Sequence, residues 1–209
     1  MIDGFEQIFE LAKPYLDTRD NEIHTIVATT FANKLLHAEE GDASVVIPAI
    51  MLHDVGWKSV PEDLQLRAFG PGENDESIKR IHEVAGARIA REILDRVRYP
   101  PALVDEICRI IEAHDTRLEA LSLNDAIVKD SDKLWRLSEE ALMVDPPRFK
   151  IDRVVHLKWL GRQIASWFIT LSAREMALQE YRARGESFGI SPEELEENLR
   201  GNDASVVSP

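Results

Sequence analysis

The sequence contains a single cysteine, Cys108, so the chain cannot form an internal disulfide bond. Positive charge is also scarce: 25 Lys and Arg against 38 Asp and Glu give a net charge of −13, which argues against tight binding to a nucleic-acid backbone. The acidic first ten residues do not resemble a signal peptide, and no apolar run is long enough to span a membrane. We therefore expect a cytoplasmic protein with neither a nucleic-acid polymer nor a membrane among its partners.

The alternation of apolar and polar residues that indicates β-strands is absent too, and the apolar residues recur at helical spacing. Because 44% of the chain is hydrophobic, it can form a substantial core. We predict an all-α, single-domain helical bundle over residues 1–184 and an acidic, flexible tail over residues 185–209 with at most one short helix, beginning at Pro192. The predicted helices span residues 5–16, 22–40, 43–54, 76–96, 99–114, 123–137 and, as one long final helix, 151–184.

Two segments rich in proline or glycine interrupt this helical pattern. Residues 56–75 predict a long loop, of the kind that often covers a functional site. The stretch VDPPRF, residues 144–149, predicts a break between helices. The final helix has apolar residues on more than one face, so it either wraps the domain or pairs with a second copy in a homodimer.

Histidines recur on the inward faces of the predicted helices. His24, His82 and His114 each share a face with apolar residues on a different helix, and His53 and Asp54 end the buried segment 43–54. One such histidine alone is usually a packed core residue. Burying several imidazoles and carboxylates without a cation would cost more free energy than folding has to spare. Since imidazole nitrogens and carboxylate oxygens are ligands of divalent transition metals, the set predicts a metal site.

Two further carboxylates, Asp130 and Asp132, lie in the helix predicted over residues 123–137. Both have apolar neighbours, and helical periodicity does not decide which of them joins the histidines.

Together these motifs resemble the HD-domain superfamily of metal-dependent phosphohydrolases, whose fold is all-α. The resemblance runs over residues 21–137, through HDVG, RIHEVAGARIAREIL, IIEAHD and KDSDKLW. It implies one or two divalent ions (Mn, Fe, Co, Ni, Zn or Mg). The implied ligands of the first are His24, His53, Asp54 and, since the family aspartate precedes a Lys/Arg-Leu pair, Asp132. In members with two ions, residues matching His82 and His114 bind the second and Asp54 bridges.

The resemblance also implies a reaction, in which a metal-activated water attacks the phosphorus of a small phosphorylated substrate such as a nucleotide. Asp54 would orient the nucleophile, His82 and His114 would hold a second ion or donate protons, and Lys58 would neutralise the substrate. Lys79, Arg80 and Lys133 are weaker candidates for that last role.

Two other functions use the same residues. Some members of the superfamily hold two irons at these six positions and cleave C–C or C–P bonds with O₂. A nucleotide sensor without catalytic activity is the other alternative, although a pure binder has no need of a water-activating centre. Neither the substrate nor the metal is specified by the residue types alone.

Overall fold

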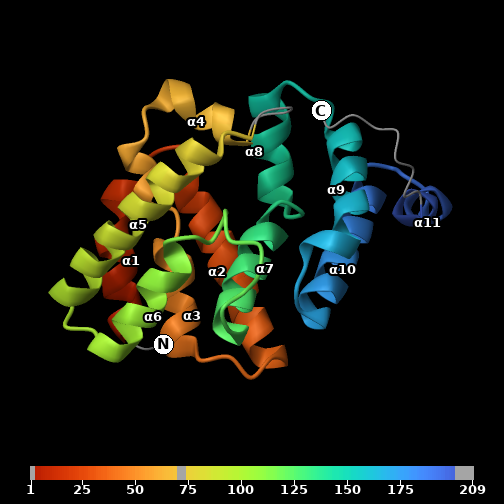
Figure 1. Cartoon of the computed structure of the whole chain (residues 1–209). Coiled ribbons are helices and arrows are strands. Elements are labelled where there is room, and N and C mark those ends of the chain that lie inside the picture. Colours follow the sequence, from red (N-terminus) through yellow and green to blue (C-terminus); the bar gives the residue numbers. More distant parts are fainter. Residues whose placement is uncertain (1–2, 70–73, 201–209) are drawn as a thin grey trace.

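A computed structural model describes residues 3–69 and 74–200 of the chain. These residues form helices and connections with no β-strand, which confirms the all-α prediction (Figure 1). In chain order the helices are α1 (Asp3–Leu16), α2 (Asn21–Ala38), α3 (Ala43–Leu52), the 3₁₀ helix η1 (Val55–Ser59), α4 (Glu62–Phe69), α5 (Glu76–Arg96), α6 (Pro101–Ile111), α7 (Leu123–Trp135), α8 (Glu139–Phe149), α9 (Arg153–Trp167), α10 (Leu171–Ser187) and α11 (Pro192–Arg200). None of the described helices is both long and apolar enough to cross a membrane.

Helix α3 is the centre of the N-terminal half. Its sequence, ASVVIPAIML, is apolar on almost every side, and a helix of that kind is stable only when other elements surround it. It packs against α1, α2, α6 and α7. Helix α7 also contacts α10, so it lies between the N-terminal helices and the C-terminal pair α9–α10 (Figure 1). The carboxyl end of α3 therefore opens into the middle of the domain.

Side-chain caps determine where many of the helices begin. A short polar residue just before each of six helices accepts a hydrogen bond from an amide of the first turn, which would otherwise lack a partner. These residues are Asp42, Asp75, Ser122, Ser138, Asp152 and Thr170. Proline has the equivalent role at α6, where Pro101 occupies the first helical position.

Two predicted irregular segments are in fact largely helical. The predicted loop over residues 56–75 contains most of η1 and all of α4, while its residues 70–73 lie outside the described part of the chain. The VDPPRF stretch lies inside α8 rather than between helices, and Pro146 and Pro147 fall in its last two turns. The helix ends soon after them, where Lys150 adopts a left-handed conformation and its amide donates to Pro146 O and Pro147 O.

The single long helix predicted over residues 151–184 was wrong, because the chain breaks after Trp167. Phe168 is extended, Thr170 caps α10, and α9 and α10 pack against each other as a pair. The apolar residues on several faces of this segment thus belong to two helices.

The predicted acidic tail is only partly correct. A short helix does begin at Pro192, but α10 continues to Ser187 and α11 packs against both α9 and α10. Leu195 of α11 is 1% exposed and lies so close to Gly185 that a Cβ there would come within 2.4 Å of its side chain. Residues 188–200 are therefore folded against the domain. Residues 201–209 lie outside the described part of the chain.

Candidate metal centre

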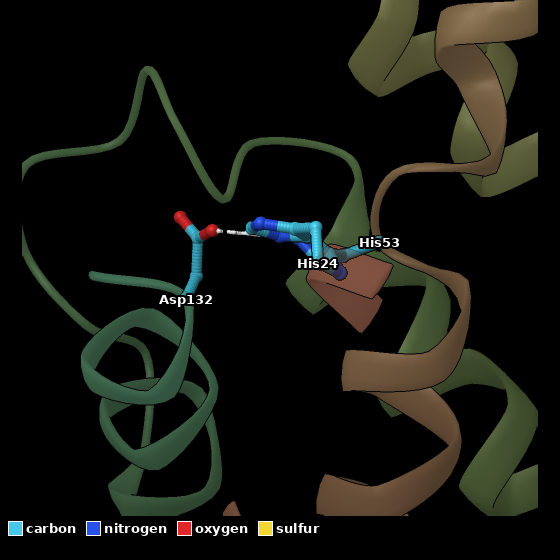
Figure 2. Close-up of side chains that lie close together, drawn as sticks. All are labelled: His24, His53 and Asp132. Atoms are coloured by element: carbon cyan, nitrogen blue, oxygen red, sulfur yellow. Dashed lines mark hydrogen bonds and ion pairs between the residues drawn. The ribbon is translucent and has the colours of Figure 1, made fainter. Parts of the chain in front are cut away.

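Residues from three helices converge beside the carboxyl end of α3. His24 is in the first turn of α2, His53 directly follows α3, and Asp132 is in the last turn of α7. Figure 2 shows the Asp132 carboxylate facing the two imidazole rings. Asp132 Oδ1 is 3.2 Å from His24 Nε2 and 3.5 Å from His53 Nε2, and the two Nε2 atoms are 3.0 Å apart.

A second group of donors adjoins the first. His82 Nε2, from α5, lies 3.4 Å from His114 Nε2, which follows α6. Both nitrogens face Asp115 Oδ2, at 3.3 Å and 3.6 Å respectively. Asp54 connects the two groups: its Oδ1 is 3.6 Å from His53 Nε2, 3.8 Å from His114 Nε2 and 3.9 Å from His82 Nε2. The structure thus brings together all six of the predicted metal ligands.

Asp115 is a site residue that sequence reasoning missed. It forms a second His-Asp pair with His114 in the IIEAHD stretch, so a signal was present in the sequence. Sequence position alone does not show that its carboxylate turns toward His82 on a different helix.

Backbone contacts orient the imidazoles. The Nδ1–H of His53 donates to Ile50 O and that of His114 to Ile111 O, both at 2.8 Å. A neutral imidazole that donates through Nδ1 carries a lone pair on Nε2, so both rings direct lone pairs into the cluster. Lone pairs that face one another require a proton or a cation between them.

Gly56 and Trp57 determine how closely η1 approaches α5. A Cβ at Gly56 would lie 1.9 Å from the carbonyl oxygen of His82, so only glycine fits there. Next to it, the Trp57 ring stacks on the His82 ring with a centroid distance of 4.0 Å. Its Nε1–H donates to Asp54 Oδ1 at 3.0 Å. The HDVGW segment thereby fixes the Asp54 carboxylate beside His82.

The charges in the cluster shift its pKa values strongly. Burial raises the pKa of Asp54, but the neighbouring imidazolium groups, first of all His53, outweigh burial and hold that pKa well below its usual range. For His114, burial lowers the pKa, but the carboxylates of Asp115 and Asp54 outweigh burial and raise it to about 10. Burial and the charge of His114 lower the pKa of His82 to about 3. Without a metal ion, the carboxylates are stabilised by protonated histidines, a role that a divalent cation can take over.

The donor set fits a metal ion in chemistry and in spacing. Nitrogen and oxygen ligands lie about 2.1 Å from a divalent ion, so adjacent ligands are about 3 Å apart, close to the shortest distances here. Three sets of donor atoms lie mutually within 4.8 Å: His24, His53 and Asp132; His53, Asp54 and His114; His82, His114 and Asp115. Since the middle set shares His53 with the first and His114 with the third, the cluster can hold one ion or two neighbouring ions.

Two buried side chains support the turn that carries His114 and Asp115. Glu83 is 0% exposed, and its carboxylate accepts the amides of Asp115 and Thr116, both at 2.9 Å, as well as the Thr116 hydroxyl. The Lys129 ammonium donates to His114 O at 2.6 Å. Such contacts behind the ligands set the orientation of the ligands themselves.

All four of the predicted cationic residues bond elsewhere. Lys58 pairs with Asp17 at 2.6 Å, its side chain is 47% exposed, and it is not among the residues that line the cavity beside the cluster. Arg80 pairs with Glu83, and Lys133 donates to the carbonyl oxygen of Trp167, at 2.7 and 2.9 Å. The weaker candidate Lys79 likewise bonds to Asn74.

Arginines take the place of those cations around the cavity, whose empty volume, part of it open to solvent, is about 490 Å³. Its floor includes His24, Asp54, Asp115 and Asp132. The remaining lining residues are Arg19, Asn21, Trp57, Phe69, Trp135, Arg136, Asp145, Arg148 and Phe149. The three arginines escaped sequence reasoning, although Arg19 and Arg136 lie within five residues of His24 and Asp132, because residue type and spacing do not show which cations face the cavity.

Comparison with known proteins is consistent with a metal centre formed by this cluster. The HD domain family matches residues 21–137, more than half of the chain. This chain belongs to the HD domain family. HD domains bind divalent metal ions, and the His/Asp clusters of this HD domain can hold one.

The fold is also similar to that of a solved protein, described as a predicted HD superfamily hydrolase from an uncultured Thermotogales bacterium. The two chains share 21% sequence identity, the match covers 88% of each chain, and the TM-score is 0.59. No curated protein matches this HD domain protein.

Proposed function

We propose that this HD domain protein is a metal-dependent phosphohydrolase, which cleaves a phosphoester or phosphoanhydride bond of a small substrate with a metal-activated water. One observation carries the proposal: imidazole nitrogens and carboxylate oxygens face one another at the floor of an open cavity. A divalent ion bound there lowers the pKa of its water from 15.7 toward ~7 and offsets the charge that develops on phosphoryl oxygens. The similar Thermotogales protein, described as a predicted hydrolase, supports this assignment.

The positions of the donor residues relative to the cavity indicate different roles for the two aspartates and for His82 and His114. Asp54 and Asp132 line the cavity and therefore reach both an ion and the substrate side, so Asp54 is well placed to orient the attacking water. His82 and His114 do not line the cavity; their Nε2 atoms lie behind it, against Asp115. This position favours their role as ligands of a second ion over that of proton donors to the substrate.

The proposal is tested by elemental analysis of purified protein together with a panel of phosphatase and nucleotidase substrates, assayed with Mn, Co, Ni, Mg, Zn and Fe. We expect bound metal and release of phosphate or pyrophosphate, and we expect His53→Ala and Asp54→Ala to lose metal and turnover while helicity by circular dichroism persists. Oxygen-dependent product formation by iron-loaded protein without phosphate release would assign oxygenase chemistry instead. Metal or nucleotide binding without turnover would assign a sensor.

A further inference from the structure

Arg19 occupies an unusual position at the edge of the metal centre. It lies in the connection between α1 and α2, shortly before His24, and both Arg19 and Asp20 have a φ of 57°. Left-handed conformations are unfavourable for residues other than glycine, and such backbone strain is concentrated at functional sites. Arg148 of α8 stabilises the turn: its Nη2 donates to Arg19 O at 2.8 Å and to Asp20 Oδ2 at 2.7 Å.

This turn directs the Arg19 guanidinium onto the ring that holds Asp54. The guanidinium carbon is 4.1 Å from the centroid of the Trp57 ring. Because His82 stacks on the same ring at 4.0 Å, Arg19 must cover the opposite face. Trp57 in turn donates its Nε1–H to Asp54. Arg19 and the Asp54 carboxylate therefore both contact the Trp57 indole, Arg19 at its face and Asp54 at its N–H edge.

Two guanidinium groups around the cavity lack an anionic partner. Nε and Nη1 of Arg19 are buried and have no hydrogen-bond partner, and no ion pair of Arg19 or Arg136 occurs within residues 3–69 and 74–200. Arg148 differs, because it pairs with both Asp145 and Asp20. A buried guanidinium without an anionic partner is unfavourable, and the chain carries a large excess of acidic residues that elsewhere pair with its cations.

We propose that Arg19, together with Arg136, binds the terminal phosphoryl group of a phosphomonoester whose phosphorus faces the metal centre. This inference rests on the proposed hydrolase function and names the substrate class. A monoester phosphoryl group is a dianion, which matches two unpartnered guanidinium groups, and the planar fork of Arg19 can contact two of its oxygens at once. A phosphodiester carries one charge and a second substituent, so it satisfies these groups less well.

The experiment compares Arg19→Ala, Arg19→Lys and the wild-type protein, each loaded with the metal that supports turnover. The readouts are kcat/KM for p-nitrophenyl phosphate and for bis(p-nitrophenyl) phosphate, the affinity for inorganic phosphate by calorimetry, and metal content. We expect the wild-type protein to prefer the monoester. Arg19→Ala should lower kcat/KM for the monoester on the order of 10²-fold and weaken phosphate binding about tenfold, with unchanged metal content.

Arg88→Ala is the matched control, since Arg88 lies on the surface of α5 and pairs only with Glu92 within the described residues. It should behave as the wild-type protein. Arg19→Lys retains the positive charge but not the planar, forked guanidinium. Its kcat/KM and phosphate affinity should therefore lie between those of the wild-type protein and of Arg19→Ala, which would show that the effect of Arg19→Ala is not merely unfolding. Arg136→Ala should weaken phosphate binding as well, by a smaller factor.

The outcomes separate this inference from the proposed function. If Arg19→Ala retains metal, monoester turnover and phosphate affinity, the arginine site is overturned and the hydrolase function stands. If the wild-type protein prefers the diester, the substrate class is overturned. If no metal supports hydrolysis but phosphate binding depends on Arg19, the anion site stands and the hydrolase proposal fails.

Discussion

Two aspartates on opposite faces of α7 show how the same residue type serves two different ends. Asp132 faces α2 and the cavity, where its partners are the imidazoles of His24 and His53. Asp130 faces the α9–α10 connection and accepts the amides of Ile169 and Thr170, both at 2.8 Å. Residues two apart on a helix lie about 200° from each other, which explains why the two side chains reach different regions.

The difference between the two regions lies in the partners. Two backbone N–H groups and the Thr170 hydroxyl donate to Asp130, which thereby holds the connection between the end of α9 and the start of α10. Asp132 meets imidazole nitrogens, some of which carry lone pairs, so its surroundings remain incomplete until a proton or a cation arrives. Hydrogen-bond partners therefore distinguish a structural carboxylate from a candidate metal ligand where periodicity does not.

Asp132→Asn is expected to have the largest effect of the substitutions that test this difference. We expect it to lower kcat/KM by about 10³-fold or more and to reduce bound metal, because an amide is a poor replacement for a carboxylate ligand. The metal-free protein should also unfold at a somewhat lower temperature, since the substitution removes a carboxylate whose pKa, despite burial, is lowered by its contacts with the imidazoles of His24 and His53. Full metal content and activity in this variant would contradict the ligand assignment.

Glu83 is another buried carboxylate that accepts hydrogen bonds from amides, as Asp130 does, but it supports the turn that carries the candidate metal ligands His114 and Asp115. We expect Glu83→Ala to lower kcat/KM by about 10–100-fold and to weaken metal binding, because the amides of Asp115 and Thr116 lose their acceptor. Glu83→Gln, which keeps an acceptor oxygen, should recover most of the loss. A loss of stability with unchanged metal affinity would show that Glu83 acts only in folding.

Asp130→Ala tests the structural role of the Asp130 carboxylate. It leaves the amides of Ile169 and Thr170 without their acceptor, so we expect the free energy of unfolding to fall by about 1–3 kcal/mol. Metal content and kcat/KM per folded molecule should be retained. Denaturant unfolding and elemental analysis of the same preparation measure both. Loss of metal at full stability would reverse the roles assigned to the two aspartates.

The smallest effect is expected from Lys58→Ala. The sequence made Lys58 a candidate for substrate binding, but its ammonium pairs with Asp17 at the surface and it does not line the cavity. We therefore expect kcat and KM to change by less than about twofold, since exposed ion pairs contribute little. A rise of tenfold or more in KM would mean that Lys58 turns toward the substrate.

Much of the fold could be predicted from helical periodicity, and α5 begins and ends at the residues expected. The break between α9 and α10 could not, because it depends on Asp130, which is distant in sequence from Thr170. Periodicity also missed η1 and α4, because helices of only five and eight residues carry little periodic signal.

Some residues of the candidate site could likewise be predicted from the sequence, and others could not. Its histidines and Asp54 could be predicted because several costly polar groups on apolar helix faces require a common cation. Asp130 and Asp132 needed family resemblance, since both lie among apolar residues. Arg19 could not be predicted at all: its role depends on a left-handed turn and on a ring from η1.

Elemental analysis of the wild-type protein beside Asp132→Asn and Asp130→Asn tests the central claim most directly. Each protein is stripped with a chelator, reloaded and desalted before the bound ions are counted. We expect one or two divalent ions per chain for the wild type and Asp130→Asn, and a clear loss for Asp132→Asn. A wild-type chain that binds no divalent ion after reloading, or equal metal in all three proteins, would contradict it.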